Sequence, residues 1–213
     1  MSSAQEMKDA VCRIAKKAYN EKLMAGTSGN VTMFDHKRGQ MAVTPSNFDY
    51  IDMTPDDVVV MNLDGEVLEG EHKPSSEWRM HAEVYRARED ISACVHTHSP
   101  RATSFAVVQE KVPVILTEMM PFIGGDIPLA EFALPGTVEL GYNTVSALEK
   151  RNACLLENHG VVAIGKNLDQ AYLRAVYVED AAKIYHYARA LGTPVLLPDD
   201  SLSTLRERYN LPE

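Results

Sequence analysis

The sequence predicts an α/β fold in which helices flank the layers of a β-sheet, and three observations support this prediction. Short apolar runs of strand character alternate along the chain with amphipathic segments of helical period, an interleaving typical of a sheet covered by helices. The chain has 213 residues, of which 45% are hydrophobic, so it is long enough to bury a substantial core. No internal repeat, low-complexity tract or linker divides it. We therefore expect one domain over residues 1–213.

The net charge and the cysteines exclude several classes of protein. A formal net charge of −9 argues against a nonspecific nucleic-acid binder, which would carry a basic stripe, although local loops can still bind a small anion. Cys12, Cys94 and Cys154 are far apart in apolar surroundings, so we expect buried free thiols in a reducing compartment. There is no run of 18 apolar residues, and the N-terminus is too polar for a secretory signal. We expect a cytoplasmic protein that does not enter a membrane.

The first third of the chain reads as a helix followed by strands. Apolar residues at helical spacing predict an amphipathic helix over residues 4–19. Residues 31–34 and 40–43 have strand character and are expected to pair across the polar turn between them. The apolar run 58–62 predicts a buried strand, and the Asp-Gly pair within 63–66 predicts the turn of a hairpin.

Later segments continue the alternation of strands and helices. The run 112–116 predicts a strand, with Pro113 at its start or on a sheet edge. The run 153–156 predicts a buried strand that residues 161–165 continue after a polar interruption. Helices are expected over 135–150, over 168–191 with Asn167 or Asp169 as the N-cap, and in the acidic tail to about residue 209.

Two histidines, His96 and His98, lie in a segment, 93–99, that predicts a buried strand. Residues i and i+2 of a strand share one face, with Cα atoms about 6.6 Å apart. Two imidazoles at that separation can converge on one metal ion. The alternative is a pair of hydrogen-bonded histidines in a polar cleft, and the pair by itself leaves both interpretations open.

Glu77 lies at the start of a helix expected over 74–88, for which Ser75 or Ser76 is the candidate N-cap. A carboxylate in the first helical turn is favourable to the helix dipole, which is a purely structural explanation. The alternative is a metal ligand or a base held at the helix start. His81 follows at i+4 on the same face. For His81 we favour a structural role at the edge of the core over a role as a partner of the metal site.

Two turns are rich in hydroxyl groups. Gly26 and Gly29 bracket Thr27 and Ser28 in a turn that exposes backbone N–H groups, an arrangement that can hold an anion but is also common in plain loops. Residues 44–47 form the second such turn.

Asn158, His159 and Gly160 interrupt an apolar run farther along the chain. Buried polar groups at such a position are costly unless they are paired or bind a ligand. This stretch therefore favours the interpretation that the two strand histidines belong to a metal site.

Five motifs, in the same order and with compatible spacing, resemble those of the class II aldolase/adducin family, most closely its branch of L-fuculose-1-phosphate aldolases. They are Gly26-Thr27-Ser28-Gly29-Asn30-Val31, Thr44-Pro45-Ser46, Pro74-Ser75-Ser76-Glu77-Trp78-Arg79, His96-Thr97-His98 and Asn158-His159-Gly160. Each motif is weak alone, but the five together are specific and span nearly the whole chain. The resemblance implies a three-layer α/β/α fold with a largely antiparallel central sheet. It also implies a fourfold-symmetric homotetramer with active sites at the subunit interfaces.

The resemblance further implies a zinc ion held by His96, His98 and His159. Glu77 would complete the resting site and act as the base once substrate displaces it. Three neutral imidazoles leave the open position that a catalytic zinc requires, and Mn²⁺ or Co²⁺ also tolerate such ligands. The residues matched to the binding site of the substrate phosphate are Thr27, Gly29, Asn30, Thr44, Ser46, Ser75 and Ser76.

The sequence departs from the family pattern in one respect. Fuculose-phosphate aldolases place a tyrosine in the stretch matching residues 117–120, where it reaches a neighbouring site and protonates the leaving alkoxide. Glu118 stands at that place in this chain, and a carboxylic acid needs a pKa raised by burial to do the same work. Tyr209 matches a C-terminal tyrosine of these aldolases, which favours a tail that closes over the site.

The activity expected from the resemblance is that of an aldehyde-lyase. It would cleave L-fuculose 1-phosphate, or a 5-deoxypentulose 1-phosphate, to dihydroxyacetone phosphate and a short aldehyde. A pentulose-5-phosphate 4-epimerase is the alternative enzyme, although such epimerases tend to carry Asp or Asn in place of Glu77. A non-catalytic scaffold like the adducin head domains would be indicated by loss of the zinc histidines, and here all three are present.

Overall fold

The computed structural model describes residues 4–211, and over these the strands form one eight-stranded sheet in the order β4-β3-β2-β1-β5-β8-β7-β6. All neighbouring strands are antiparallel except β6 and β7. The strands are β1 (Asn30–Asp35), β2 (Gln40–Val43), β3 (Val59–Met61), β4 (Val67–Glu69), β5 (Ala93–Thr97), β6 (Leu129–Ala130), β7 (Ala153–Leu156) and β8 (Gly160–Gly165). The sheet therefore has the largely antiparallel character that the resemblance implies.

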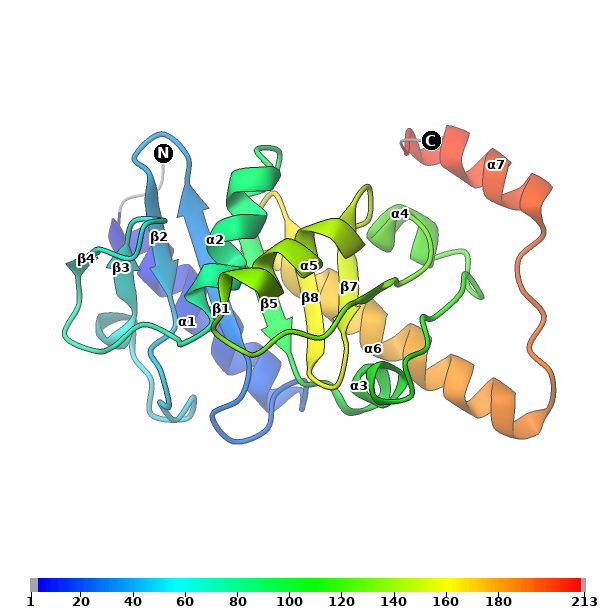
Figure 1. Ribbon diagram of the computed structural model, residues 1–213, viewed down its shortest axis with the longest axis horizontal. Helices are drawn as coiled ribbons and strands as arrows, with labels where there is room; N and C mark the ends of the chain where they lie inside the picture. The colour runs from blue at the N-terminus through cyan, green and yellow to red at the C-terminus, as the bar shows by residue number, and fades with distance from the viewer. Residues whose placement is uncertain (1–3, 212–213) are drawn as a thin grey trace.

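Helices cover both faces of this sheet and complete three layers (Figure 1). In chain order they are α1 (Ala4–Asn20), the 3-10 helix η1 (Pro55–Asp57), α2 (Trp78–Ala87), α3 (Pro100–Val107), α4 (Met119–Ile123), α5 (Val138–Leu148), α6 (Leu168–Leu191) and α7 (Asp199–Tyr209). One face carries α1 and α6, and the other carries α2 and α5 (Figure 1). The expected α/β/α arrangement is confirmed.

The core is divided by the sheet into two clusters. Because side chains alternate along each strand, Val95 of β5 packs with the residues of α1 and α6, whereas its neighbour Cys94 packs with those of α2 and α5. Cys12, Cys94 and Cys154 are buried free thiols, as expected. The same alternation directs His96 to the face that α2 covers.

Most expected elements are present. The opening helix, the pairing of β1 with β2, the hairpin of β3 and β4, and the C-terminal helix all occur at or near the expected residues. Asn167, rather than Asp169, caps α6, because its side-chain oxygen accepts a hydrogen bond from the backbone N–H of Gln170 at 2.9 Å. Within residues 4–211, no helix combines the length and the apolar character needed to cross a membrane.

Three expectations about local structure are wrong. Residues 112–116 form a loop with a single bridge from Val112 to Ile127, since Pro113 has no N–H to extend the ladder. Residues 161–165 do not continue the preceding strand; β8 turns back antiparallel to β7. Helix α2 begins at Trp78, and the N-cap position belongs to Glu77 instead of to either serine.

Three short elements have weak signals in the sequence. Helix α3 begins at Pro100 directly after Ser99, a Ser-Pro pair that favours a helix start. Helix α4 has only five residues and β6 only two, so neither is long enough to show a period.

Candidate metal and substrate site

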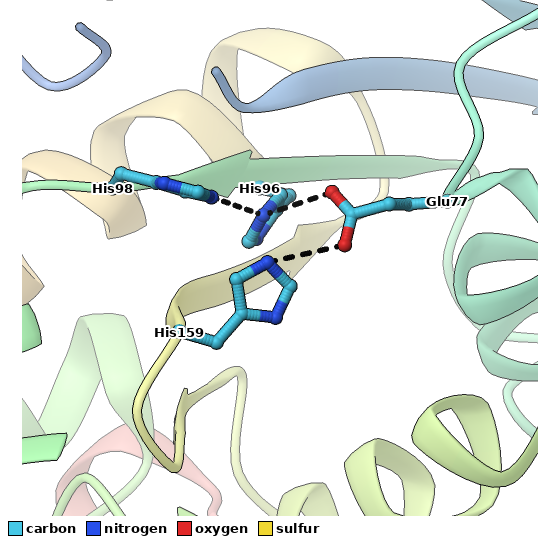
Figure 2. A group of neighbouring side chains, drawn as sticks. All are labelled: Glu77, His96, His98 and His159. Carbon is cyan, nitrogen blue, oxygen red and sulfur yellow. Dashed lines mark hydrogen bonds and ion pairs between the residues drawn. The ribbon is translucent and has the colours of Figure 1, made fainter. Parts of the chain in front are cut away.

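Four side chains from three parts of the chain meet at one end of the sheet. Glu77 comes from the start of α2, His96 and His98 from the carboxyl end of β5, and His159 from the turn between β7 and β8 (Figure 2). One nitrogen or oxygen of each lies within 4.8 Å of those of the others. Residues more than 80 positions apart in the sequence thus form one cluster of candidate ligands.

The strand β5 brings the first two histidines together as its alternation predicts. The Nε2 atoms of His96 and His98 are 3.0 Å apart, and the centroid of each ring lies 4.8 to 5.0 Å from that of His159. The Nδ1–H of His96 donates a hydrogen bond of 2.9 Å to the backbone carbonyl of Val161. Because that carbonyl can only accept, the proton is on Nδ1, and the lone pair of Nε2 faces the cluster.

The turn between β7 and β8 is shaped to present His159. Asn158 adopts a left-handed φ of 52°, and the backbone N–H of His159 bonds to the carbonyl of Leu156 at 3.0 Å. Gly160 then passes directly against β5, where an added Cβ would collide with the carbonyl oxygen of Thr97. The requirement for glycine at this close approach explains its place after the histidine.

The carboxylate of Glu77 faces two of the three rings. Its Oε2 lies 3.2 Å from Nε2 of His96, and its Oε1 lies 3.1 Å from Nε2 of His159. Burial acts to raise the pKa of Glu77, but His96 and His159 outweigh it and hold the pKa far below its usual range. Burial, together with His96 and His159, lowers the pKa of His98 to about 3. At neutral pH the cluster therefore holds an ionised carboxylate and at least one neutral imidazole.

The donor set fits a divalent transition metal. Imidazole nitrogens and a carboxylate oxygen are the ligands that Zn²⁺, Mn²⁺ and Co²⁺ accept. Oε1 of Glu77 is buried without a hydrogen-bond partner. Two ring nitrogens 3.0 Å apart, one of them unprotonated, are likewise better satisfied by a shared cation than by each other.

A cavity of about 440 Å³ opens beside the cluster. Glu77, His98 and His159 form one wall. The remaining lining residues are Ala25, Thr27, Ser28, Gly29, Asn30, Pro45, Ser46, Asn47, Ser75, Ser76 and Pro135. Among these described residues there is no lysine or arginine, so an anion there would be held by hydroxyl, amide and backbone N–H groups.

Six of the seven residues expected to bind phosphate line this cavity, and Thr44 does not. Thr44 is fully buried, and its Oγ1 accepts a hydrogen bond from the backbone N–H of Val31 at 3.2 Å. It therefore supports the strand from behind the cavity wall. The side-chain amide of Asn30 is also engaged, since its Nδ2 donates to Oε2 of Glu77 at 2.9 Å.

One residue behind the glycine turn was not singled out in the sequence. The hydroxyl of Tyr50 donates to the carbonyl of Gly29 at 2.6 Å. Gly29 has a left-handed φ of 77°, and a Cβ there would lie 2.8 Å from the carbonyl oxygen of His96. Tyr50 and the missing Cβ thus fix the turn against β5. No local pattern reveals this contact, because it joins residues 21 positions apart.

Glu118 and Tyr209 do not join the cluster within one chain. Glu118 is the exposed N-cap residue of α4, and Tyr209 is the last residue of α7. Neither lines the cavity. Helices α4 and α7 contact each other and lie toward the opposite end of β7 and β8 from the turn that joins these strands (Figure 1).

The fold and the site together define a class of α/β protein with a histidine-rich cluster that could hold a metal, and comparison with known proteins identifies the family. Residues 9–186 match the model of the "Class II Aldolase and Adducin N-terminal domain", so the chain belongs to the class II aldolase/adducin family.

Curated relatives cover most of the chain. It is 38% identical to the 5-deoxy-D-ribulose 1-phosphate aldolase of Bacillus thuringiensis serovar kurstaki over 96% of each chain. It is 34% identical to the L-fuculose phosphate aldolase of Escherichia coli K12 over 88% of this chain and 86% of that one. A solved structure of an L-fuculose 1-phosphate aldolase superposes with a TM-score of 0.93 at 40% identity, covering 99% of both chains.

Proposed function

We propose that the protein is a metal-dependent aldehyde-lyase that cleaves a ketose 1-phosphate to dihydroxyacetone phosphate and a short aldehyde. The observation that carries this proposal is the cluster of Glu77, His96, His98 and His159 on the wall of a cavity lined by neutral anion donors. The two named relatives act, by their names, on 5-deoxy-D-ribulose 1-phosphate and on L-fuculose phosphate. A site for a phosphate beside a site for a metal matches both substrates.

In this proposal the three histidines and Glu77 hold Zn²⁺, with Mn²⁺ or Co²⁺ as tolerated substitutes. When bound, the metal supplies the Lewis acid that polarises the substrate carbonyl and stabilises the enediolate left by breaking of the carbon–carbon bond. The protein supplies the orientation of the ligands, since the bond from His96 to the carbonyl of Val161 fixes that ring.

Glu77 is the proposed base for the hydroxymethyl carbon of dihydroxyacetone phosphate. In cleavage it returns a proton to that carbon, and in the reverse direction it removes it. While its oxygens face His96 and His159 its pKa is far too low for this work, so it acts only after it is released from them.

The phosphate is proposed to lie in the turns that line the cavity. The residues that would hold it are Thr27, Gly29, Asn30, Ser46, Ser75 and Ser76. Backbone N–H groups and hydroxyls bind such a group without lysine, in keeping with the acidic chain. Thr44 supports this wall from behind.

The group that takes the proton of the substrate hydroxyl as the aldehyde forms, and returns it to the alkoxide in the reverse direction, is proposed to come from another copy of the chain. Glu118 takes this role, and Tyr209 closes the site, in a homotetramer with active sites at the subunit interfaces. Neither Glu118 nor Tyr209 lines the cavity within one chain, which supports this arrangement. The proposed location is the cytoplasm, in keeping with three buried free thiols.

The test is a measurement of metal content followed by an assay for release of dihydroxyacetone phosphate. The protein, purified without chelator and then loaded with zinc, is offered 5-deoxy-D-ribulose 1-phosphate, L-fuculose 1-phosphate and a pentulose 5-phosphate. We expect release from one or both 1-phosphates. Conversion of the 5-phosphate to its epimer without cleavage would indicate the epimerase instead. Failure to bind metal would indicate a non-catalytic scaffold.

A further inference from the structure

We propose that His81 is a positioning residue that acts through Asn30 to orient the carboxylate of Glu77. In this proposal Asn30 tethers Oε2, which leaves Oε1 as the oxygen that takes and returns the proton. The inference rests on the proposed function for the role of Glu77, and on contacts outside the metal cluster for the tether.

A continuous chain of buried hydrogen bonds leads to Glu77 from α2 and β1. The hydroxyl of Tyr85 donates to the carbonyl of Thr32 at 3.0 Å and lies 2.7 Å from its Oγ1. Oγ1 of Thr32 lies 2.8 Å from Nδ1 of His81, whose Nε2 is hydrogen-bonded to Oδ1 of Asn30. Nδ2 of Asn30 then donates to Oε2 of Glu77 at 2.9 Å.

From the hydroxyl of Thr32 onward, the donors in this chain point toward Glu77. Oδ1 of Asn30 can only accept, so the proton of His81 lies on Nε2, and Nδ1 accepts from the hydroxyl of Thr32. His81 is fully buried and touches no carboxylate, so the ring is neutral and has one N–H to give. A flipped Asn30 amide would set its oxygen against an ionised carboxylate and its NH₂ against the N–H of His81. The histidine therefore fixes which end of the amide meets Glu77.

The fold holds each member of the chain in place. Asn30 lies opposite His96 in the ladder of β1 and β5, so its side chain starts beside the cluster. His81 lies four residues after Glu77, one turn along the start of α2, and reaches Asn30 from the same side.

This arrangement makes the two carboxylate oxygens of Glu77 inequivalent. Oε2 accepts the bond from Asn30. Oε1 instead faces Nε2 of His159 at 3.1 Å, across the cluster (Figure 2). A carboxylate tethered at one oxygen keeps its other oxygen directed at the cavity after it is released from the histidines. Without the tether it would rotate, and proton transfer would slow while substrate binding would not change.

Two substitutions at His81 separate the tether from packing. The amide nitrogen of Gln reaches about as far as Nε2, so His81→Gln keeps a donor for Asn30. The Asn side chain in His81→Asn reaches only as far as Nδ1 of the ring, so this variant loses that donor.

In zinc-loaded enzyme we expect His81→Asn to lower kcat by about 10-fold or more, the usual effect of losing a hydrogen bond that serves a charged group, with KM and zinc content near wild type. His81→Gln should recover most of kcat. The control is Thr144→Val, which removes a buried hydroxyl from α5 that bonds only to its own helix and should keep kcat.

A second measurement needs neither metal nor turnover. In proton NMR spectra of the metal-free protein, the Nε2–H of His81 should give a downfield resonance that is absent from both His81 variants. Glu77→Gln should shift this resonance, because Asn30 is hydrogen-bonded to both side chains.

A wild-type kcat in His81→Asn would overturn the proposal, as would a loss of kcat that His81→Gln does not recover. A resonance that Glu77→Gln leaves unmoved would also overturn it. An inactive wild type would refute the proposed function, yet the NMR result would still decide whether the tether exists.

Discussion

Two regions of the molecule differ in how completely one chain builds them. At the end of the sheet where β5, the turn between β7 and β8, and α2 meet, the four candidate metal ligands lie close together; Glu77 and His96 are buried, and His98 and His159 are half-buried. At the C-terminal side, no residue of α7 is buried, and Leu191 and Val195, in the approach to it, are 90% and 88% exposed. A single chain therefore assembles the cluster of Glu77 and the three histidines but leaves its C-terminal elements uncovered.

The physical origin of the difference is the presence or absence of tertiary partners. The register of β1, β5 and β8 fixes Asn30, His96 and Val161 relative to one another. The end of α6 has no such ladder and exposes Ile184, Tyr187 and Leu191. Exposed apolar groups in one area are typical of a surface that another protein chain covers. This supports the proposal that Glu118 and Tyr209 act in a neighbouring copy.

The largest effect should follow from loss of a metal ligand. His96→Ala, His98→Ala and His159→Ala should each abolish measurable cleavage and lower zinc occupancy, because two remaining ring nitrogens hold the ion poorly. Zinc occupancy is measured by mass spectrometry, and cleavage is measured by the release of dihydroxyacetone phosphate. His186→Ala, an exposed histidine outside the cluster, is the control and should keep both. Full zinc occupancy in any of the three variants would remove that histidine from the ligand set.

A smaller effect is expected from substitutions of Glu118 and Tyr209, beside or within helices α4 and α7. Glu118→Gln should lower kcat for cleavage by about 100-fold, the low end of the usual contribution of a general acid–base group, with zinc content unchanged. Tyr209→Phe should have a weaker effect on kcat. If Glu118→Gln cleaves at the wild-type rate, another group transfers this proton, and Glu118 of a neighbouring copy does not complete the site.

The smallest effect is expected at the phosphate wall. Removing one hydroxyl with Ser76→Ala should raise KM for the sugar phosphate about 10-fold or more, because a hydrogen bond to a charged group contributes about 1.5–3 kcal/mol. Turnover at saturation should change little. Thr44→Ser, which keeps the bond to the backbone of Val31 behind the wall, serves as the matched control. Equal cleavage of the unphosphorylated sugar by the wild type would show that this cavity wall does not bind an anion.

The sequence predicts the parts of the site that depend on short-range geometry. Strand alternation places His96 beside His98, and the helical spacing of four places His81 on the same face as Glu77. The flanking of a sheet by helices also follows, because strands and helices of sufficient length show their periods, whereas the three-layer arrangement was expected from the resemblance. The largely antiparallel character of the sheet was expected from the resemblance to a family, and the order of its strands was not predicted, since nothing in the local pattern specifies it.

Contacts between distant residues could not be predicted in this way. The burial of Thr44 behind the cavity and the bond from Asn30 to Glu77 depend on the register between β1 and its neighbours. The turn back at Asn158 was missed because a left-handed residue in an apolar run has no periodic signature. The strand expected over 112–116 was wrong because β-propensity does not decide whether a partner strand is within reach.

The most direct test of the contrast between the two regions is a half-reaction that needs no aldehyde. Zinc-loaded enzyme is mixed with dihydroxyacetone phosphate in deuterated water, and exchange of the proton on the hydroxymethyl carbon is followed by NMR. Glu77→Gln should exchange about 100- to 10,000-fold more slowly than wild type while it retains zinc, because the base is lost but the three histidines remain. Glu118→Gln should exchange at the wild-type rate. Wild-type exchange by zinc-loaded Glu77→Gln would contradict the account and leave Glu77 as only a carboxylate at a helix start.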